Sequence, residues 1–219
     1  MDFELFLLVC NYIGTIAFAV SGAVKGFKKN LDIFGITLLS AITAVGGGMI
    51  RDTLIGQFPV ALADPSSIYL SLVVGIIMYL FVISQESETL RKRQMVQFLT
   101  KTNLIFDAIG LSIFALIGAS AGVNLNVNGL TSGILATLTG VGGGIIRDLL
   151  VNETPIVLKE DVYAVLALCE GLIYHMLVID WDLPRIPVYL VIFSIALLIR
   201  LLVIRYNLHL PNMEKHKQV

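Results

Sequence analysis

The feature that most constrains this sequence is a ten-residue stretch that occurs twice. Thr43-Ala-Val-Gly-Gly-Gly-Met-Ile-Arg-Asp52 recurs 96 residues later as Thr139-Gly-Val-Gly-Gly-Gly-Ile-Ile-Arg-Asp148, and eight of the ten positions are identical. Each copy lies inside an apolar run, where each glycine lowers helix propensity by about 1 kcal/mol and an arginine is costly. A chain that repeats this combination at matched positions is expected to use it.

Composition identifies the environment of these stretches. With 57% hydrophobic residues, 14% charged residues and a mean hydropathy of +0.87, the 219-residue chain lies outside the range of soluble domains. Nucleic acid binding has no support, and Cys10 and Cys169 are interpreted as small buried apolar side chains. The sequence predicts one all-α transmembrane domain over residues 1–219, with seven spans: 3–24, 31–56, 68–84, 103–122, 127–151, 162–179 and 186–204.

The 96-residue offset extends beyond the glycine motif. Residues 13–26 match residues 109–122 at seven of fourteen positions. Residues 3–84 and 103–179 are therefore interpreted as two copies of one unit, and helix 186–204 has no counterpart. Because each unit contains three spans, the second must enter the membrane from the opposite side, which makes an inverted repeat of the kind common in transporters.

Lysine and arginine residues predict the orientation of the chain. With the N-terminus outside, eleven of them fall in cytoplasmic segments and one, Arg185, falls outside. The positive-inside rule then predicts an outside N-terminus and a cytoplasmic C-terminus.

The glycines suggest two different roles. Three consecutive glycines cover every face of a helix, so a break or kink is expected with freed backbone groups along a polar path, and local flexibility without a ligand is the alternative. Small residues at helical spacing in the helices before each triplet indicate close packing. The expected kink residues are Gly46, Gly47, Gly48, Gly142, Gly143 and Gly144, and the packing residues are Gly14, Gly22, Gly26, Gly110, Gly118 and Gly122.

Charged residues inside the apolar runs are the candidate pore or gate residues: Arg51, Asp52, Arg147, Asp148, Asp107 and Glu170. Adjacent residues on a helix do not face each other, so each arginine is expected to pair with the aspartate of the other repeat or with Asp107. An ion-pair lock and direct contact with a substrate are both compatible with this pattern. We expect Arg51 to form such a lock across the repeat interface and Arg147 to gate the path. Glu170 could pair with an arginine or His175, or carry protons.

Enzyme chemistry has no support in the sequence. There is no nucleophile with a histidine partner, no metal-spaced histidine pair and no phosphate-binding loop, because the glycine runs lack the Lys-Ser/Thr of a P-loop. No catalytic residue, metal site or cofactor is expected.

The duplicated Gly-Gly-Gly-x-x-Arg-Asp, the Asp107-Ala-Ile-Gly-Leu start of the fourth helix and the unpaired seventh helix resemble the prokaryotic trimeric intracellular cation (TRIC) channel family. Its bacterial members are also described as glycine transporters. The resemblance covers residues 3–204 and implies a homotrimer in the prokaryotic inner membrane, with a pore in each protomer, helices 2 and 5 kinked around it, permeant potassium or sodium, and bound lipid. Animal members carry a lysine-containing motif where this chain has Ala44-Val45-Gly46.

The residues and the resemblance favour different functions. Intramembrane arginines oppose cation passage unless acids neutralise them, whereas an arginine beside an acid suits the two charges of a zwitterion such as glycine. The resemblance favours a channel, which is the function we adopt, with a zwitterion transporter as the alternative. A purely structural membrane protein would account for the packing glycines but not for the doubled charged motifs.

Overall fold

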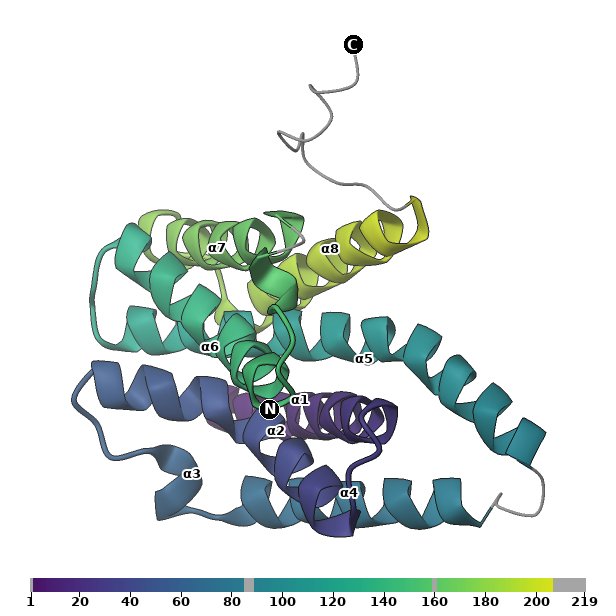
Figure 1. The fold of residues 1–219 in the computed structure, drawn as a ribbon. Helices are drawn as coiled ribbons and strands as arrows, with labels where there is room; N and C mark the ends of the chain where they lie inside the picture. The colour runs from purple at the N-terminus through teal and green to yellow at the C-terminus, as the bar shows by residue number, and fades with distance from the viewer. Residues whose placement is uncertain (1, 85–88, 159–160, 207–219) are drawn as a thin grey trace.

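The computed structural model describes residues 2–84, 89–158 and 161–206, and within them every regular element is helical (Figure 1). Seven helical segments are long and apolar enough to cross a membrane, which confirms the seven-span prediction. The helices are α1 (Phe3–Lys28), α2 (Ile33–Leu54), α3 (Val60–Ala63), α4 (Ser66–Ile83), α5 (Thr89–Asn124), α6 (Gly129–Leu150), α7 (Asp161–His175) and α8 (Arg185–Tyr206).

Two features depart from the predicted spans. Helix α5 begins at Thr89, so part of the expected interruption before its span is helical, and α7 continues as a π-helical segment, η2 (Met176–Asp180). A 3₁₀ turn, η1 (Ile156–Leu158), follows α6. Lys159, Lys215 and Lys217, which entered the charge count, lie outside the described residues.

The helix ends show why the sequence stops and starts where it does. Asp32 accepts a hydrogen bond from the Gly35 amide at 2.7 Å to begin α2, and Asn128 accepts one from the Thr131 amide at 2.8 Å to begin α6. Asn30, just after α1, has a φ of +54°. The matching Asn126, just after α5, has a φ of +53°. Asparagine tolerates this left-handed conformation, which lets the chain turn sharply after each helix.

The expected break at the glycine triplets is wrong. Helices α2 and α6 continue without interruption through their triplets to Leu54 and Leu150. A continuous helix satisfies its own backbone groups where no water is present to bond them. A kink within each continuous helix stays a prediction.

The middle glycine of each triplet lies where α2 and α6 cross. A Cβ atom at Gly47 would collide with the carbonyl oxygen of Thr139, and one at Gly143 would collide with that of Thr43. A Cβ atom at Gly48 would have Arg51 Nη2, on the same helix, as its nearest neighbour beyond the helix backbone, at 3.9 Å. The triplets therefore allow two helix backbones to touch, and the two contacts are the same when residue numbers are shifted by 96.

The packing glycines make reciprocal contacts of the same kind. Gly14 lies against Phe114 and Gly110 against Phe18, and the two phenylalanine rings stack with centroids 5.3 Å apart. The others lie against the start or middle of the following helix: Gly22 against Leu39, Gly26 against Ile36, Gly118 against Leu135, and Gly122 against Ser132. These glycines bring α1 onto α2 and α5 onto α6.

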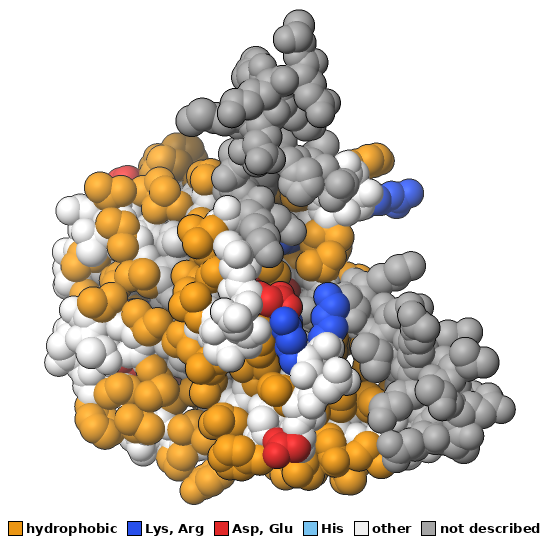
Figure 2. Space-filling model, viewed as in Figure 1, with side chains coloured by type: hydrophobic (Ala, Val, Ile, Leu, Met, Phe, Trp, Pro, Cys, Tyr) orange, Lys and Arg blue, Asp and Glu red, His pale blue; other side chains and the backbone are white. Residues whose placement is uncertain are grey.

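The surface is predominantly apolar. Figure 2 shows hydrophobic side chains spread over much of the coloured part of the visible face, with a few charged side chains gathered near its centre. Many large apolar side chains, such as Phe34 on α2 and Val191 on α8, are exposed. Cys169 is exposed as well, which corrects the expectation that both cysteines are buried. Contact of such an apolar surface with lipid tails is favourable, whereas its contact with water is not.

Candidate functional site

The last turns of α2 and α6 each carry one arginine that pairs with the aspartate that follows it. Arg51 Nε donates to Asp52 Oδ1 at 2.8 Å, and Arg147 Nε donates to Asp148 Oδ1 at 3.0 Å. The expectation that adjacent residues cannot pair is wrong here, because the long arginine side chain folds back along its helix to reach the next carboxylate. The second oxygen of each aspartate accepts a backbone amide, from Val60 and Ile156 respectively.

Arg147 has a second acid and is almost completely buried. Its Nη1 atom lies 2.8 Å from Asp107 Oδ1 on α5 and 2.6 Å from Ser21 Oγ on α1. Only 1% of the residue is exposed. The expected alternative that an arginine pairs with Asp107 is therefore confirmed for Arg147.

Lys25 on α1 and Lys29, which follows that helix, extend these contacts toward the chain segment after α6. Lys25 Nζ lies 3.0 Å from Asp148 and 2.7 Å from Glu153, and Lys29 Nζ lies 2.9 Å from Glu153. Hydrogen bonds from Lys25, the larger influence, and from Lys29 hold the pKa of the Glu153 carboxyl at about 2, well below its ordinary value of 4.5. We call Ser21, Lys25, Asp107, Arg147, Asp148 and Glu153 the Arg147 cluster.

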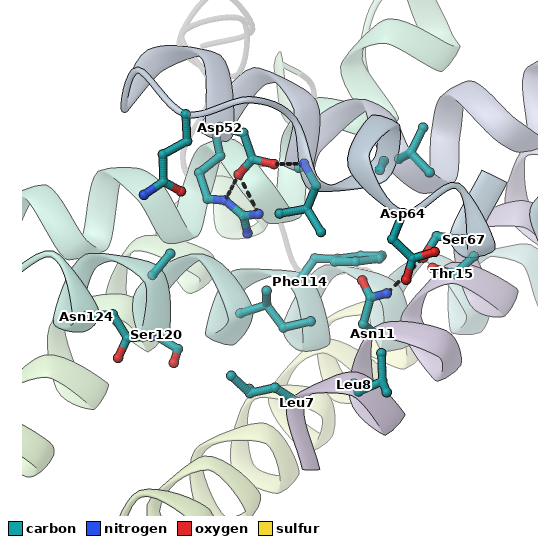
Figure 3. Close-up of a pocket in the computed structure, with 18 of the residues that line it drawn as sticks. Leu7, Leu8, Asn11, Thr15, Asp52, Asp64, Ser67, Phe114, Ser120 and Asn124 are labelled. Carbon is teal, nitrogen blue, oxygen red and sulfur yellow. Dashed lines mark hydrogen bonds and ion pairs between the residues drawn. The ribbon is translucent and has the colours of Figure 1, made fainter. Parts of the chain in front are cut away.

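Arg51 lines a cavity instead. The cavity has a volume of about 470 Å³ and extends from Gly48, beside the helix crossing, to Glu4 and Asn124 at helix ends (Figure 3). Its wall includes Asn11, whose amide donates to Ser67 Oγ at 2.9 Å. Arg51 is 9% exposed, and among the described residues its ion-pair partner is Asp52, so its guanidinium is less enclosed than that of Arg147.

Acidic groups outnumber basic ones around this cavity. Among the described residues, the charged ones that line it are Arg51, Asp52, Asp64 and Glu4, three carboxylates with one guanidinium. Figure 3 shows Asp52 held between the arginine and a backbone amide, and Asp64 near Asn11 and Ser67 at one side of the cavity. A cavity with this balance attracts cations.

Glu170 belongs neither to the Arg147 cluster nor to the wall of the Arg51 cavity. It is 2% exposed on α7, and within the described chain neither of its carboxyl oxygens makes a hydrogen bond. His175, the suggested partner, instead lies 3.0 Å from Ser132 Oγ. The sequence placed Glu170 among the pore or gate charges, but it does not line the Arg51 cavity.

Three members of the Arg147 cluster were missed by the sequence analysis: Ser21, Lys25 and Glu153. Lys25 was counted only as a loop charge, although it stands between the packing residues Gly22 and Gly26. The difference between the repeats could have identified them. At an offset of 96 residues, Ser21, Lys25 and Glu153 correspond to Ile117, Ala121 and Gln57, none of which is charged. Matched positions that differ in polarity indicate where the surroundings of the two arginines differ.

Seven spans, a glycine-mediated helix crossing and a cavity beside it that is lined by both apolar and charged side chains define an α-helical membrane protein. Residues 8–84 and 104–178 match the family model described as glycine transporter. A prokaryotic TRIC channel crystallised in 0.5 M KCl is 37% identical, with a TM-score of 0.82 over 94% of this chain and 100% of that chain.

Two further proteins show the same similarity. The TRIC orthologue from Rhodobacter sphaeroides is 29% identical, with a TM-score of 0.81 over 93% of this chain and 99% of its own. The UPF0126 inner membrane protein YadS of Escherichia coli K12 is 33% identical over 202 residues, 92% of this chain and 93% of its own. The chain belongs to the prokaryotic TRIC channel family, a family of channels and not of enzymes.

Proposed function

We propose that this protein conducts monovalent cations, potassium in particular, through a path within each protomer. The observation that carries the proposal is the neutralisation of both intramembrane arginines. Arg51 pairs with Asp52, and Arg147 pairs with Asp107 and Asp148. Since carboxylates offset the positive charge of each guanidinium, these arginines do not oppose the passage of cations.

The acidic balance of the Arg51 cavity supports the same proposal. Three carboxylates and one guanidinium line it, and the path would continue from there past the crossing of α2 and α6. A prokaryotic TRIC channel and other TRIC cation channels are among the similar structures. Potassium and sodium are the proposed permeant ions.

Assembly and placement follow from the same relatives. We propose a homotrimer, because a similar structure is that of a trimeric intracellular cation channel. We propose the prokaryotic inner membrane, with the N-terminus outside and lipid around the apolar surface, because a curated relative is an inner membrane protein. Reciprocal contacts at a constant offset of 96 support an inverted repeat of residues 3–84 and 103–179.

A transporter of glycine or another small zwitterion is the second candidate. The description of the matching family model favours it, and so does an arginine beside acids in one cavity, which could hold the carboxylate and ammonium groups of a zwitterion.

One experiment separates the two functions. Purified protein in liposomes is tested by single-channel recording in potassium gradients and, in parallel, by uptake of radiolabelled glycine. We expect unitary potassium currents far above the turnover of a carrier, and no saturable glycine uptake. Saturable glycine uptake without unitary currents would replace the channel by the transporter.

A further inference from the structure

Glu170 is an acid buried inside the apolar bundle. It lies on α7 near the middle of the span Tyr163–Asp180 and is 2% exposed. Neither of its carboxyl oxygens has a hydrogen-bond partner within the described chain. An ionised carboxylate is very costly in such surroundings unless a cation lies beside it. The carboxyl group is therefore expected to hold a proton.

The arginines of the neighbouring helices have other contacts. Arg147 on α6 pairs with Asp107 on α5 at 2.8 Å. The Arg200 guanidinium on α8 lies 4.7 Å from the centre of the Tyr163 ring. In the part of the chain that the structure describes, neither arginine is paired with Glu170.

The other titratable side chains around Glu170 also make their contacts elsewhere. His175, five residues further along the chain, lies 3.0 Å from Ser132 Oγ on α6. Tyr189 on α8 faces Glu170, but its hydroxyl donates to the Ile113 carbonyl oxygen at 2.9 Å. Cys10 on α1 lies beside Tyr189. These groups leave the Glu170 carboxyl without a counter-charge.

Three buried hydroxyl groups connect Glu170 with the Arg51 cavity. Ser112 on α5 lies near the Glu170 carboxyl. Tyr174 lies four residues after Glu170, a spacing at which side chains on a helix are neighbours, and both residues are buried. Ser120 on α5 lies near the Tyr174 hydroxyl and lines the cavity (Figure 3). Among the described residues none of these hydroxyl oxygens has a hydrogen-bond partner, although buried hydroxyls normally have one.

The first repeat has no polar side chain at the matched positions. The architecture therefore accepts apolar residues there, and the burial of four polar side chains in the second repeat is not required by the fold. A costly feature that the fold does not need indicates a function. At an offset of 96 residues, Ser112, Ser120, Glu170 and Tyr174 correspond to Ile16, Val24, Val74 and Met78.

We propose that Glu170 is a proton-binding site that exchanges its proton with the Arg51 cavity through the hydroxyl groups of Tyr174 and Ser120. In each transfer a hydroxyl accepts one proton and releases another, so no charge remains on Tyr174 or Ser120. Release of the proton leaves a carboxylate at Glu170 and places the proton on water in the cavity, and uptake reverses these steps. The site lets the protein respond to pH on the cavity side, whichever solute passes.

Infrared spectroscopy tests whether Glu170 holds a proton. Purified protein is measured at pH 8 in a maltoside detergent, which has no carbonyl group of its own. A protonated carboxyl absorbs at a higher frequency than a carboxylate or an amide. We expect such a band in the wild-type protein and its loss in Glu170→Gln, which keeps the shape of the neutral acid. Glu153→Gln is the matched control, because it removes a carboxylate that is ionised at this pH and should leave the band in place.

Transfer into D₂O tests the route. Exchange of the carboxyl proton for deuterium lowers the frequency of the band, and the rate of this change measures access of the site to solvent. We expect Tyr174→Phe and Ser120→Ala each to keep the band and to slow exchange at least tenfold. Ser112→Ala is the control, because Ser112 does not line the cavity, and it should shift the band without slowing exchange.

Two results would overturn the proposal. The absence of a band that depends on Glu170 would show that the carboxyl is ionised and bound to a cation or to water. Unchanged exchange in both Tyr174→Phe and Ser120→Ala would show that the proton takes no such route. If Glu170→Gln does not fold, Glu170→Val, which copies Val74, serves to assign the band. Neither readout involves flux, so the proton site stands or fails separately from the channel.

Discussion

Arg51 and Arg147 differ in how far their surroundings depend on them. Arg147 is enclosed with Asp107, Asp148 and Ser21, whereas Arg51 has one acid and a cavity beside it. Removing one partner of a buried ion pair leaves the other charge unpaired, at a cost of about 3–5 kcal/mol. Removing a side chain next to a cavity of about 470 Å³ has a smaller effect, because water can replace the side chain. We therefore expect the structural lock at Arg147, whereas the sequence predicted it at Arg51.

Alanine at the two arginines should separate stability from conduction. We expect Arg147→Ala to lower stability by about 3 kcal/mol or more, because Asp107 loses its partner. Arg51→Ala should change stability less and should raise cation conductance, because it removes a positive charge from a cavity whose described lining carries more acidic than basic groups. Thermal melts of detergent-solubilised protein and bilayer recordings of both variants measure the two effects. Equal losses of stability in both would show that the arginines are equivalent.

The glycine triplets make a sharper test possible within a single motif. Gly47→Ala places a methyl group against the Thr139 carbonyl, and overpacking of this kind costs about 1–3 kcal/mol. Gly48→Ala is the matched control, since its methyl group meets nothing nearer than 3.9 Å and alanine favours the helix by about 1 kcal/mol. Thermal melts should show a loss for the first variant and none for the second. A loss of similar size in both would mean that backbone flexibility, and not close contact, is what the triplet provides.

Among the helices, α1 is joined to the segment after α6 by ion pairs that depend on pH. Lys25 and Lys29 bind Glu153 and depress its pKa to about 2 from 4.5. A carboxyl with a lowered folded-state pKa stabilises the protein fully above its ordinary pKa of 4.5 and loses that contribution as pH falls toward about 2. This connection should therefore weaken only in acid.

Glu153→Gln tests this connection. We expect the wild-type protein to melt at a higher temperature than the variant at pH 6, with the difference shrinking below pH 4.5 and vanishing near pH 2. Glu153 is partly exposed, so the difference should be small. Lys29→Met, which leaves the Lys25 pair in place, should give an intermediate result. A difference that is independent of pH would point to packing rather than charge.

The orientation of the whole molecule can be tested at two loops of almost equal exposure. Phe58, before α3, is 70% exposed and is predicted outside, whereas Leu158, at the end of η1, is 72% exposed and is predicted inside. In a background in which Cys10 and Cys169 are replaced by alanine, a membrane-impermeant maleimide should label Phe58→Cys in intact cells and Leu158→Cys only after permeabilisation. The opposite pattern would reverse the orientation.

The number of spans and the position of the polar site were predictable from the sequence, because both depend on local composition. Twenty consecutive apolar residues form a spanning helix whatever surrounds them, and a doubled Gly-Gly-Gly-x-x-Arg-Asp inside such runs marks a place of high cost. The pairing of an arginine with Asp107 was also among the expectations. The inverted relation of the repeats stays a prediction, which the reciprocal glycine contacts support.

The tertiary structure decided what each glycine and each arginine touches. The triplets were expected to break their helices, yet α2 and α6 remain continuous, because close backbone packing around Gly47 and Gly143 accommodates glycine without freeing its hydrogen bonds. The partners of Arg147 include Ser21 and Asp107, which are 126 and 40 residues away. No local pattern contains such distances, so only the packing of α1 and α5 against α6 could distinguish a buried cluster at one arginine from a cavity at the other.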